Sequence, residues 1–241
     1  MNARHGWLLH RRPFRDSSAL VDLLLPGRGL VRAVARGIHS GRSRLAQVLQ
    51  PFSPIHASCS GRGQLDTLTH AESAAPPLLL AGDALICAFY LNELLVRLLP
   101  QDEECDPILA AYGQTLQALH QGEQQLAAVL RPFEALLLAH LGYELDWQHD
   151  GHEQPLLADG RYHFTASDGW VPSGPPAQTA WSQSPRQVKG ATLLQMNQPQ
   201  QQDEWRQAAR SVLRLMLDEL LGDKPLQSRA LMRQQRLRST M

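Results

Sequence analysis

The sequence predicts a two-domain α+β protein, in which a five-stranded OB-fold barrel precedes an all-α domain with a loop-rich insertion. Three observations support this. The first seventy residues hold five short apolar runs separated by Gly-rich turns. After Pro76-Pro77 the apolar period changes to the helical 3.6. Residues 145–200 are rich in Gly, Pro, Ser and Gln. We therefore expect a barrel domain at 1–75 and a helical domain at 76–241.

The five short runs have the composition and spacing of β-strands. The turn Pro26-Gly27-Arg28-Gly29 joins two of them into a hairpin, in which Val31, Ala33 and Ala35 should share one side. A small, partly open barrel is the most economical fold for five strands in so short a segment. The expected strands are 6–10, 19–25, 30–36, 52–59 and 64–69.

The helical domain should contain several helices with recognisable ends. Asp106 is a candidate N-cap before Pro107, and Gly142 and Gly222 are candidate C-terminal residues. Pro132 should make one helix start near Arg131 or kink there. The expected helices are 78–99, 106–119, 124–141, 203–221 and the basic stretch 224–238, with a hairpin at 162–171 and a short helix at 188–196.

The net charge of zero conceals a strong segregation along the chain. Residues 1–71 hold ten arginines and three acids, a net of +7, and residues 72–160 hold two arginines and fourteen acids, a net of −12. Residues 161–241 have eleven basic and six acidic residues, a net of +5. Chance clustering on solvated surfaces is one reading, and a polyanion site on the first segment is the sharper one.

The remaining composition indicates the compartment. Cys59, Cys87 and Cys105 are odd in number and unevenly spaced, which favours a reducing cytoplasm over a disulfide framework, and Cys87 should be a buried thiol. No apolar run is long enough to span a bilayer, and we read no signal peptide. We expect a bacterial cytoplasmic, nucleoid-associated protein.

Motifs for catalysis are missing, so we expect no enzyme. The sequence has no P-loop, no G-x-G-x-x-G opening a helix, and no H-E-x-x-H, G-x-S-x-G or C-x-x-C. One alternative is a metal-dependent hydrolase that uses His149, Asp150 and His152, with Glu153 and His163 nearby. A closed zinc site needs four fixed ligands, and these lie in a Gly-rich loop, so exposed histidines are the plainer reading.

The arginines of the first segment are the positive signal. Their planar guanidinium groups bond two phosphate oxygens at once, and the flanking Gly and Ser let a backbone approach. Trp7, Phe14 and Phe52 are the few aromatics that could stack on bases, which favours a groove that tracks the backbone. The expected DNA-binding residues are Arg11, Arg12, Arg28, Arg32, Arg36, Arg42, Arg44 and Arg62.

These segments together resemble the RecO family of recombination mediators. The resemblance lies in the order and spacing of the motifs and covers nearly the whole chain. The resembling stretches are 29–37, 40–45, 49–52, 61–63, 90–95, 131–134, 140–143 and 224–229.

The resemblance implies that the chain binds single- and double-stranded DNA and anneals complementary strands. It also implies that, with RecR, the chain helps to load RecA onto DNA coated by the single-strand-binding protein SSB. Arg131 matches a family position implicated in holding the acidic C-terminal tail of SSB, although it could simply pair with Glu134. Many members carry a four-cysteine zinc site after the Leu-Gly-Tyr segment. This chain has no cysteine after Cys105, so we expect no metal and no cofactor.

Two hypotheses follow. The basic barrel neutralises the phosphates of two strands so that complementary bases can pair, and Arg131 with an apolar groove holds the SSB tail. The alternatives are a generic OB-fold RNA-binding factor, the hydrolase above and a purely structural adaptor.

Overall fold

A computed structural model describes residues 4–38, 43–61, 65–122, 126–143, 146–174, 187–197 and 202–239. The chain forms two compact units. The first comprises Met1–Leu126 together with Leu226–Met241, and the second is Ala127–Pro225. The C-terminal segment therefore returns to the unit that contains the N-terminus.

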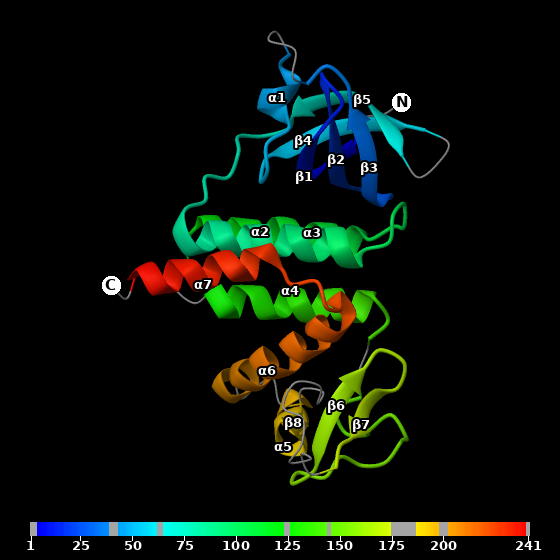
Figure 1. The fold of residues 1–241 in the computed structure, drawn as a ribbon, viewed down its shortest axis with the longest axis vertical. Helices are drawn as coiled ribbons and strands as arrows, with labels where there is room; N and C mark the ends of the chain where they lie inside the picture. The colour runs from blue at the N-terminus through cyan, green and yellow to red at the C-terminus, as the bar shows by residue number, and fades with distance from the viewer. Residues whose placement is uncertain are drawn as a thin grey trace. The chain divides into compact units, whose positions relative to one another are not determined.

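The first unit is built on a closed five-stranded barrel with the strand order β1-β2-β3-β5-β4 (Figure 1). Neighbouring strands are antiparallel except β3 and β5, which pair in parallel. The predicted OB-fold is confirmed. The strands are β1 (Arg4–Phe14), β2 (Ser18–Leu25), β3 (Gly29–Ala35), β4 (Pro54–Ser60) and β5 (Asp66–Ser73).

The barrel interior is filled by one side of each strand. Val31, Ala33 and Ala35 of β3 are fully buried in this interior cluster, as the alternation predicted. Val21 and Leu23 of β2 lie in the same cluster. Because side chains alternate between faces along a strand, the intervening positions point outward and are available for other contacts.

β1 is longer than the sequence suggested, because it continues through Pro13 to Phe14. Among the described residues β1 pairs with β4 only from Arg4 to Trp7, so Pro13 costs no hydrogen bond on that edge. Arg11 and Arg12 therefore lie within the strand, beyond its predicted end at residue 10, and Arg15 lies in the following turn with φ of 54°.

A short helix, α1 (Leu45–Val48), precedes β4 and was not predicted from the sequence. Its four residues are too few for an apolar periodicity to be visible. It is followed by Leu49, which is fully buried in the barrel cluster. The burial of this neighbour ties the helix to the barrel.

Three helices complete the first unit: α2 (Gly82–Leu98), α3 (Asp106–His120) and α7 (Gln227–Ser239). α2 starts later than predicted, because Leu78 donates its backbone N–H to the Phe52 carbonyl and the preceding segment stays extended. Asp106 is the first residue of α3 and not its N-cap. Its carboxylate instead accepts a hydrogen bond from the Gly27 amide at 2.7 Å.

A buried polar chain joins the barrel to α2 and α3. Asn92 donates to the Leu9 carbonyl at 2.8 Å, next to an irregularity in the β1–β2 register. The Tyr112 hydroxyl donates to Asn92 at 2.6 Å, and the Trp7 ring meets the Tyr112 ring edge-on. A buried network with its partners in place fixes one geometry, so the barrel and these helices form one body.

The second unit combines helices with a small sheet of order β7-β6-β8. The predicted hairpin is confirmed by the pairing of β6 and β7. Its elements are α4 (Leu126–His140), β6 (Arg161–Thr165), β7 (Gly169–Pro172), β8 (Val188–Lys189), α5 (Gly190–Leu194), the 3-10 helix η1 (Gln195–Asn197) and α6 (Gln202–Leu221).

α4 begins at Leu126 and runs through Pro132, so the first of the two expected alternatives, a start near Arg131, is wrong. Burial of Leu130, Phe133 and Leu137 on either side of the proline explains why the helix continues, since tertiary packing outweighs one missing hydrogen bond. Gly142 ends the helix as predicted, with φ of 89° and a bond from Tyr143 N–H to the Leu138 carbonyl. Within the described ranges, no helix is both long and apolar enough to cross a membrane.

Candidate nucleic-acid interface

Two of the three acids in the basic N-terminal segment are neutralised by arginines of the same segment. Asp66 receives a hydrogen bond from Arg28 at 2.7 Å, and Asp22 receives one from Arg32 at 2.7 Å. Both carboxylates are nearly inaccessible to solvent. The remaining positive charge of the barrel therefore lies with its other arginines.

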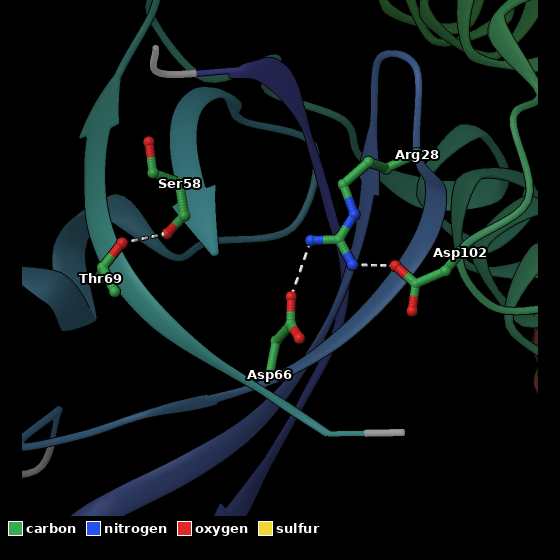
Figure 2. Close-up of polar contacts among 5 residues, drawn as sticks. All are labelled: Arg28, Ser58, Asp66, Thr69 and Asp102. Atoms are coloured by element: carbon green, nitrogen blue, oxygen red, sulfur yellow. Dashed lines mark hydrogen bonds and ion pairs between the residues drawn. The ribbon is translucent and has the colours of Figure 1, made fainter. Parts of the chain in front are cut away.

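Arg28 sits between two carboxylates from different parts of the unit (Figure 2). One guanidinium nitrogen contacts Asp66 of β5, and the other contacts Asp102 in the α2–α3 connection. These hydrogen bonds outweigh the effect of burial and raise the pKa of Arg28 above its ordinary value. The same figure shows the Thr69 hydroxyl donating to the Ser58 carbonyl between β5 and β4. Arg28 thus joins the barrel to the helices.

Asp22 lies on the outer face of the barrel opposite both Arg32 and His10. Burial disfavours its charged form, but hydrogen bonds from His10 and Arg32 prevail and lower its pKa. The pairing follows from hairpin symmetry, because Asp22 and Arg32 are equally far from the turn that joins β2 and β3. The sequence therefore held a signal that could have identified this ion pair.

Arg11 is directed to the backbone of α1. Its guanidinium donates to the Ala46 carbonyl at 3.2 Å and to the Leu49 carbonyl at 3.0 Å. Arg11 secures the short helix to the end of β1, and its backbone partners are neutral and do not cancel its charge. Its guanidinium would therefore act on a bound strand through the local electrostatic potential more than through hydrogen bonds.

The arginines with exposed side chains collect at the same end of the barrel. Arg12 lies near the end of β1, Arg15 in the β1–β2 turn, and Arg36 directly after β3. The register pairs Pro13 with Ala19 and Ala19 with Ala35, which places these three cations at one rim. Arg44 is exposed at the start of α1, and Arg11 holds that helix to the same rim. Arg42 and Arg62 lie outside the described residues.

The outer face next to this rim also offers apolar surface. Phe14, Leu20 and Val34 are half-buried there, and the Arg15 guanidinium lies 5.1 Å from the centre of the Phe14 ring. Trp7 and Phe52 are used elsewhere, because Trp7 packs on Tyr112 and Phe52 packs edge-on against Phe89. Of the three aromatics that the sequence suggested, Phe14 is the best placed to stack on a base.

Arg131 belongs to the second unit and is mostly buried on α4. Its Nη1 contacts Glu134, a carboxylate with no solvent exposure, so the pairing considered from the sequence is present. Its Nε is buried and finds no hydrogen-bond acceptor within the described part of the chain. An orphaned buried donor is costly, and it marks a position where a ligand acceptor would be favourable.

The histidines and cysteines have other environments. His149 bonds Asp146 at 2.5 Å and lowers its pKa, and His163 bonds the Ser173 hydroxyl. No group of three or more metal-ligating side chains occurs among the residues the structure describes. Cys87 is buried, as predicted. Burial and the charge of Asp66 raise the pKa of Cys59 to about 11, so its thiol is a weak nucleophile.

The fold and this rim define the class of OB-fold proteins in which a small barrel with an arginine-rich surface is joined to a helical domain. Two family models match the chain, one for the barrel and one for most of the remainder. "Recombination protein O N terminal" matches residues 1–77 and "Recombination protein O C terminal" matches residues 79–230. The chain belongs to the RecO family of DNA repair proteins, which serve recombinational repair without catalytic chemistry.

Individual relatives agree over almost their whole length. The chain is 39% identical to the DNA repair protein RecO of Nitrosococcus oceani, with 96% of this chain and 92% of the relative covered. It is 38% identical to that of Cellvibrio japonicus, with 94% of each covered. The RecO protein of Alteromonas mediterranea is 36% identical, with 94% of this chain and 95% of the relative covered.

Proposed function

We propose that this protein binds the backbones of single- and double-stranded DNA with the arginine rim of its barrel and anneals complementary strands. The observation that carries the proposal is that Asp22 and Asp66 are neutralised internally, while Arg12, Arg36 and Arg44 stay exposed at one end. In OB-folds generally, the face of strands 2 and 3 and the β1–β2 and β4–β5 loops contact oligonucleotides. The rim lies at the β1–β2 turn, and Arg62 falls in the β4–β5 connection.

The chemistry suits backbone contact more than base reading. Guanidinium groups bind phosphate oxygens in pairs, and binding releases counterions from the strand. The single well-placed aromatic, Phe14, permits stacking that does not depend on sequence. A rim that neutralises phosphates lowers the repulsion between two strands, so complementary bases can meet.

The exposed and the paired arginines give this proposal a matched test. Joint replacement of Arg12, Arg36 and Arg44 by Ala should lower the affinity for single-stranded DNA and should slow annealing. With about 0.7 counterions released per phosphate contact, the slope of log K against log salt should fall by about 2. Binding is followed by fluorescence anisotropy between about 50 and 200 mM salt.

The matched control removes three arginines of the second unit, Arg161, Arg210 and Arg214, which are also exposed. Equal affinity and an equal salt slope in the rim variant and the wild type would refute the proposal. An unlabelled RNA competitor that displaces DNA at lower concentration would instead favour the RNA-binding alternative.

A second role concerns partners. We infer that, with RecR, the protein helps to load RecA onto SSB-coated DNA, and that Arg131 holds the acidic C-terminal tail of SSB. The support is the orphaned Nε beside the buried Arg131–Glu134 pair, since a peptide carboxylate would supply the missing acceptor. The guanidinium of Arg131 would then use two N–H groups at once, one toward Glu134 and one toward the peptide, and would not act through its charge alone.

Arg131→Lys tests this role, because Lys keeps the positive charge that pairs with Glu134 but lacks the planar guanidinium group with its several N–H donors. The affinity for an SSB tail peptide should fall about tenfold, the loss expected for one charge-assisted hydrogen bond. Arg161→Ala, on an exposed strand position of the same unit, is the control. Unchanged affinity of the Lys variant, measured by calorimetry, would rule out a bidentate contact at Arg131.

A further inference from the structure

The C-terminal helix α7 is basic, and the proposed binding of DNA by the barrel rim does not involve it. It carries Arg229, Arg233, Arg236 and Arg238, and residues 224–241 contain no acid. Arg229, Arg233 and Arg236 recur at i, i+4 and i+7, so their positions share one helix face. That stripe covers about 10 Å of helix axis at 1.5 Å per residue, enough to meet more than one phosphate.

The first turn of α7 is firmly anchored to α2. The backbone amides of Gln227 and Ser228, together with the Ser228 hydroxyl, all donate to the Glu93 carboxylate. Leu226 is buried beside this contact. The negative charge of Glu93 is therefore offset by three donors at a helix N-terminus, and it does not cancel the arginines further along.

Some of the described side chains further along α7 are open to solvent. Arg233 and Gln234 are exposed, and Leu231 is 49% exposed. The Arg229 guanidinium lies over the Tyr90 ring of α2 at 5.6 Å, which holds this cation in place. A positively charged surface of this kind, with apolar area beside it, suits a nucleic-acid strand by charge complementarity.

α2 separates this surface from the arginine rim within one compact unit (Figure 1). α2 contacts β1 through Asn92, and it contacts α7 through Tyr90 and Glu93. Along β1, Arg12 lies three residues beyond the Leu9 carbonyl that Asn92 binds, so the rim extends away from α2. The unit thus has two basic surfaces with α2 between them.

We propose that α7 is a second nucleic-acid-binding surface, which holds the backbone of one DNA strand while the barrel rim holds another. The inference rests on the proposed binding of a strand by the rim. Holding one strand on each surface makes the meeting of the two strands intramolecular, which raises their effective concentration. The two strands then do not have to share the rim.

The test uses the full chain, immobilised as single molecules, and two non-complementary DNA strands that carry a donor and an acceptor dye. Wild-type protein should capture both strands and give energy transfer. Replacing Arg233, Arg236 and Arg238 by Ala should keep the affinity for the first strand within about twofold, because the rim is intact. The same variant should lose most double capture, and it should anneal complementary strands about tenfold more slowly.

Two control variants show whether an effect comes from the positive charge on α7 or from a general loss of positive charge. A separate measurement shows whether the variants fold. Arg161, Arg210 and Arg214 replaced by Ala remove three exposed cations elsewhere and should leave double capture unchanged. The joint substitutions Arg233→Lys, Arg236→Lys and Arg238→Lys keep the charge and should retain double capture. Circular dichroism melts show whether each variant folds.

Each result decides one question. Double capture that persists in the folded Ala variant overturns the second surface. The rim is tested separately with Arg12, Arg36 and Arg44 replaced by Ala. If that variant binds the first strand normally and the α7 variant binds none, the proposed function fails together with the two-surface arrangement.

Discussion

Arginines of equal charge have different roles in this barrel, and their partners decide which. Arg28 and Arg32 pair with nearly buried carboxylates, Arg11 bonds the backbone of α1, and Arg12 and Arg36 stay exposed. The sequence predicted a basic barrel surface, and the structure sorts its arginines into structural ones and available ones. Stability and strand binding should therefore depend on different residues.

Arg28→Ala should lower the free energy of unfolding by about 2 kcal/mol, because it leaves the buried Asp66 carboxylate without its charged donor. Arg12→Ala should change stability by less than about 0.5 kcal/mol, since its side chain is exposed. Urea denaturation measures both variants. Equal losses in the two variants would contradict the structural role of Arg28.

Asp22 gives a pH-dependent prediction of known sign. Its pKa is lowered in the folded protein, so its ionised form adds stability above the unfolded value of about 3.9, and that stability is lost as the pH falls through the lower folded pKa. Asp22→Asn should therefore be less stable than wild type near neutral pH. The difference should shrink below about pH 4. A difference that stays constant into acid, measured by urea unfolding, would show that the charge of Asp22 is unimportant.

Elements were predictable where local pattern decides them. The β2–β3 hairpin, the buried side of β3 and the glycine at the end of α4 follow from alternation and turn chemistry. The extension of β1 past His10, the existence of α1 and the passage of α4 through Pro132 depend on pairing and packing between distant segments. The role of Asp106 was not predictable for the same reason, because its carboxylate accepts a hydrogen bond from the Gly27 amide in a turn far away in the sequence.

The joint between β1, α2 and α3 should act as a single cooperative element. Tyr112→Phe should lower the free energy of unfolding by about 1–2 kcal/mol, because it removes the hydroxyl that donates to buried Asn92. Tyr143→Phe keeps the ring contact with Phe164 and should cost less than about 0.5 kcal/mol. Denaturation followed by near-UV and far-UV circular dichroism should shift together for Tyr112→Phe. Separate transitions would show that barrel and helices are not coupled.

At the scale of the whole molecule, the order of elements in space differs from their order in the chain. The sequence showed the +7 and −12 segments and a change of period after Pro76-Pro77. It could not show that α7 packs on α2, because that contact joins residues more than a hundred positions apart. The family models divide the chain after residue 77, whereas compactness groups the barrel with α2, α3 and α7.

This grouping predicts that the second unit can be removed. Replacing residues 127–225 by a Gly-Ser linker of about 20 residues, which spans about 25 Å on average, should leave a protein that unfolds cooperatively. It should bind single-stranded DNA within about threefold of wild type, because the arginine rim and α7 both remain. The same deletion with Glu93→Ala should be much less stable, since α7 then loses the acceptor for Gln227 and Ser228. If the linker protein fails to fold while the intact chain is stable, the barrel, α2, α3 and α7 depend on the second unit, and the discontinuous unit is not autonomous.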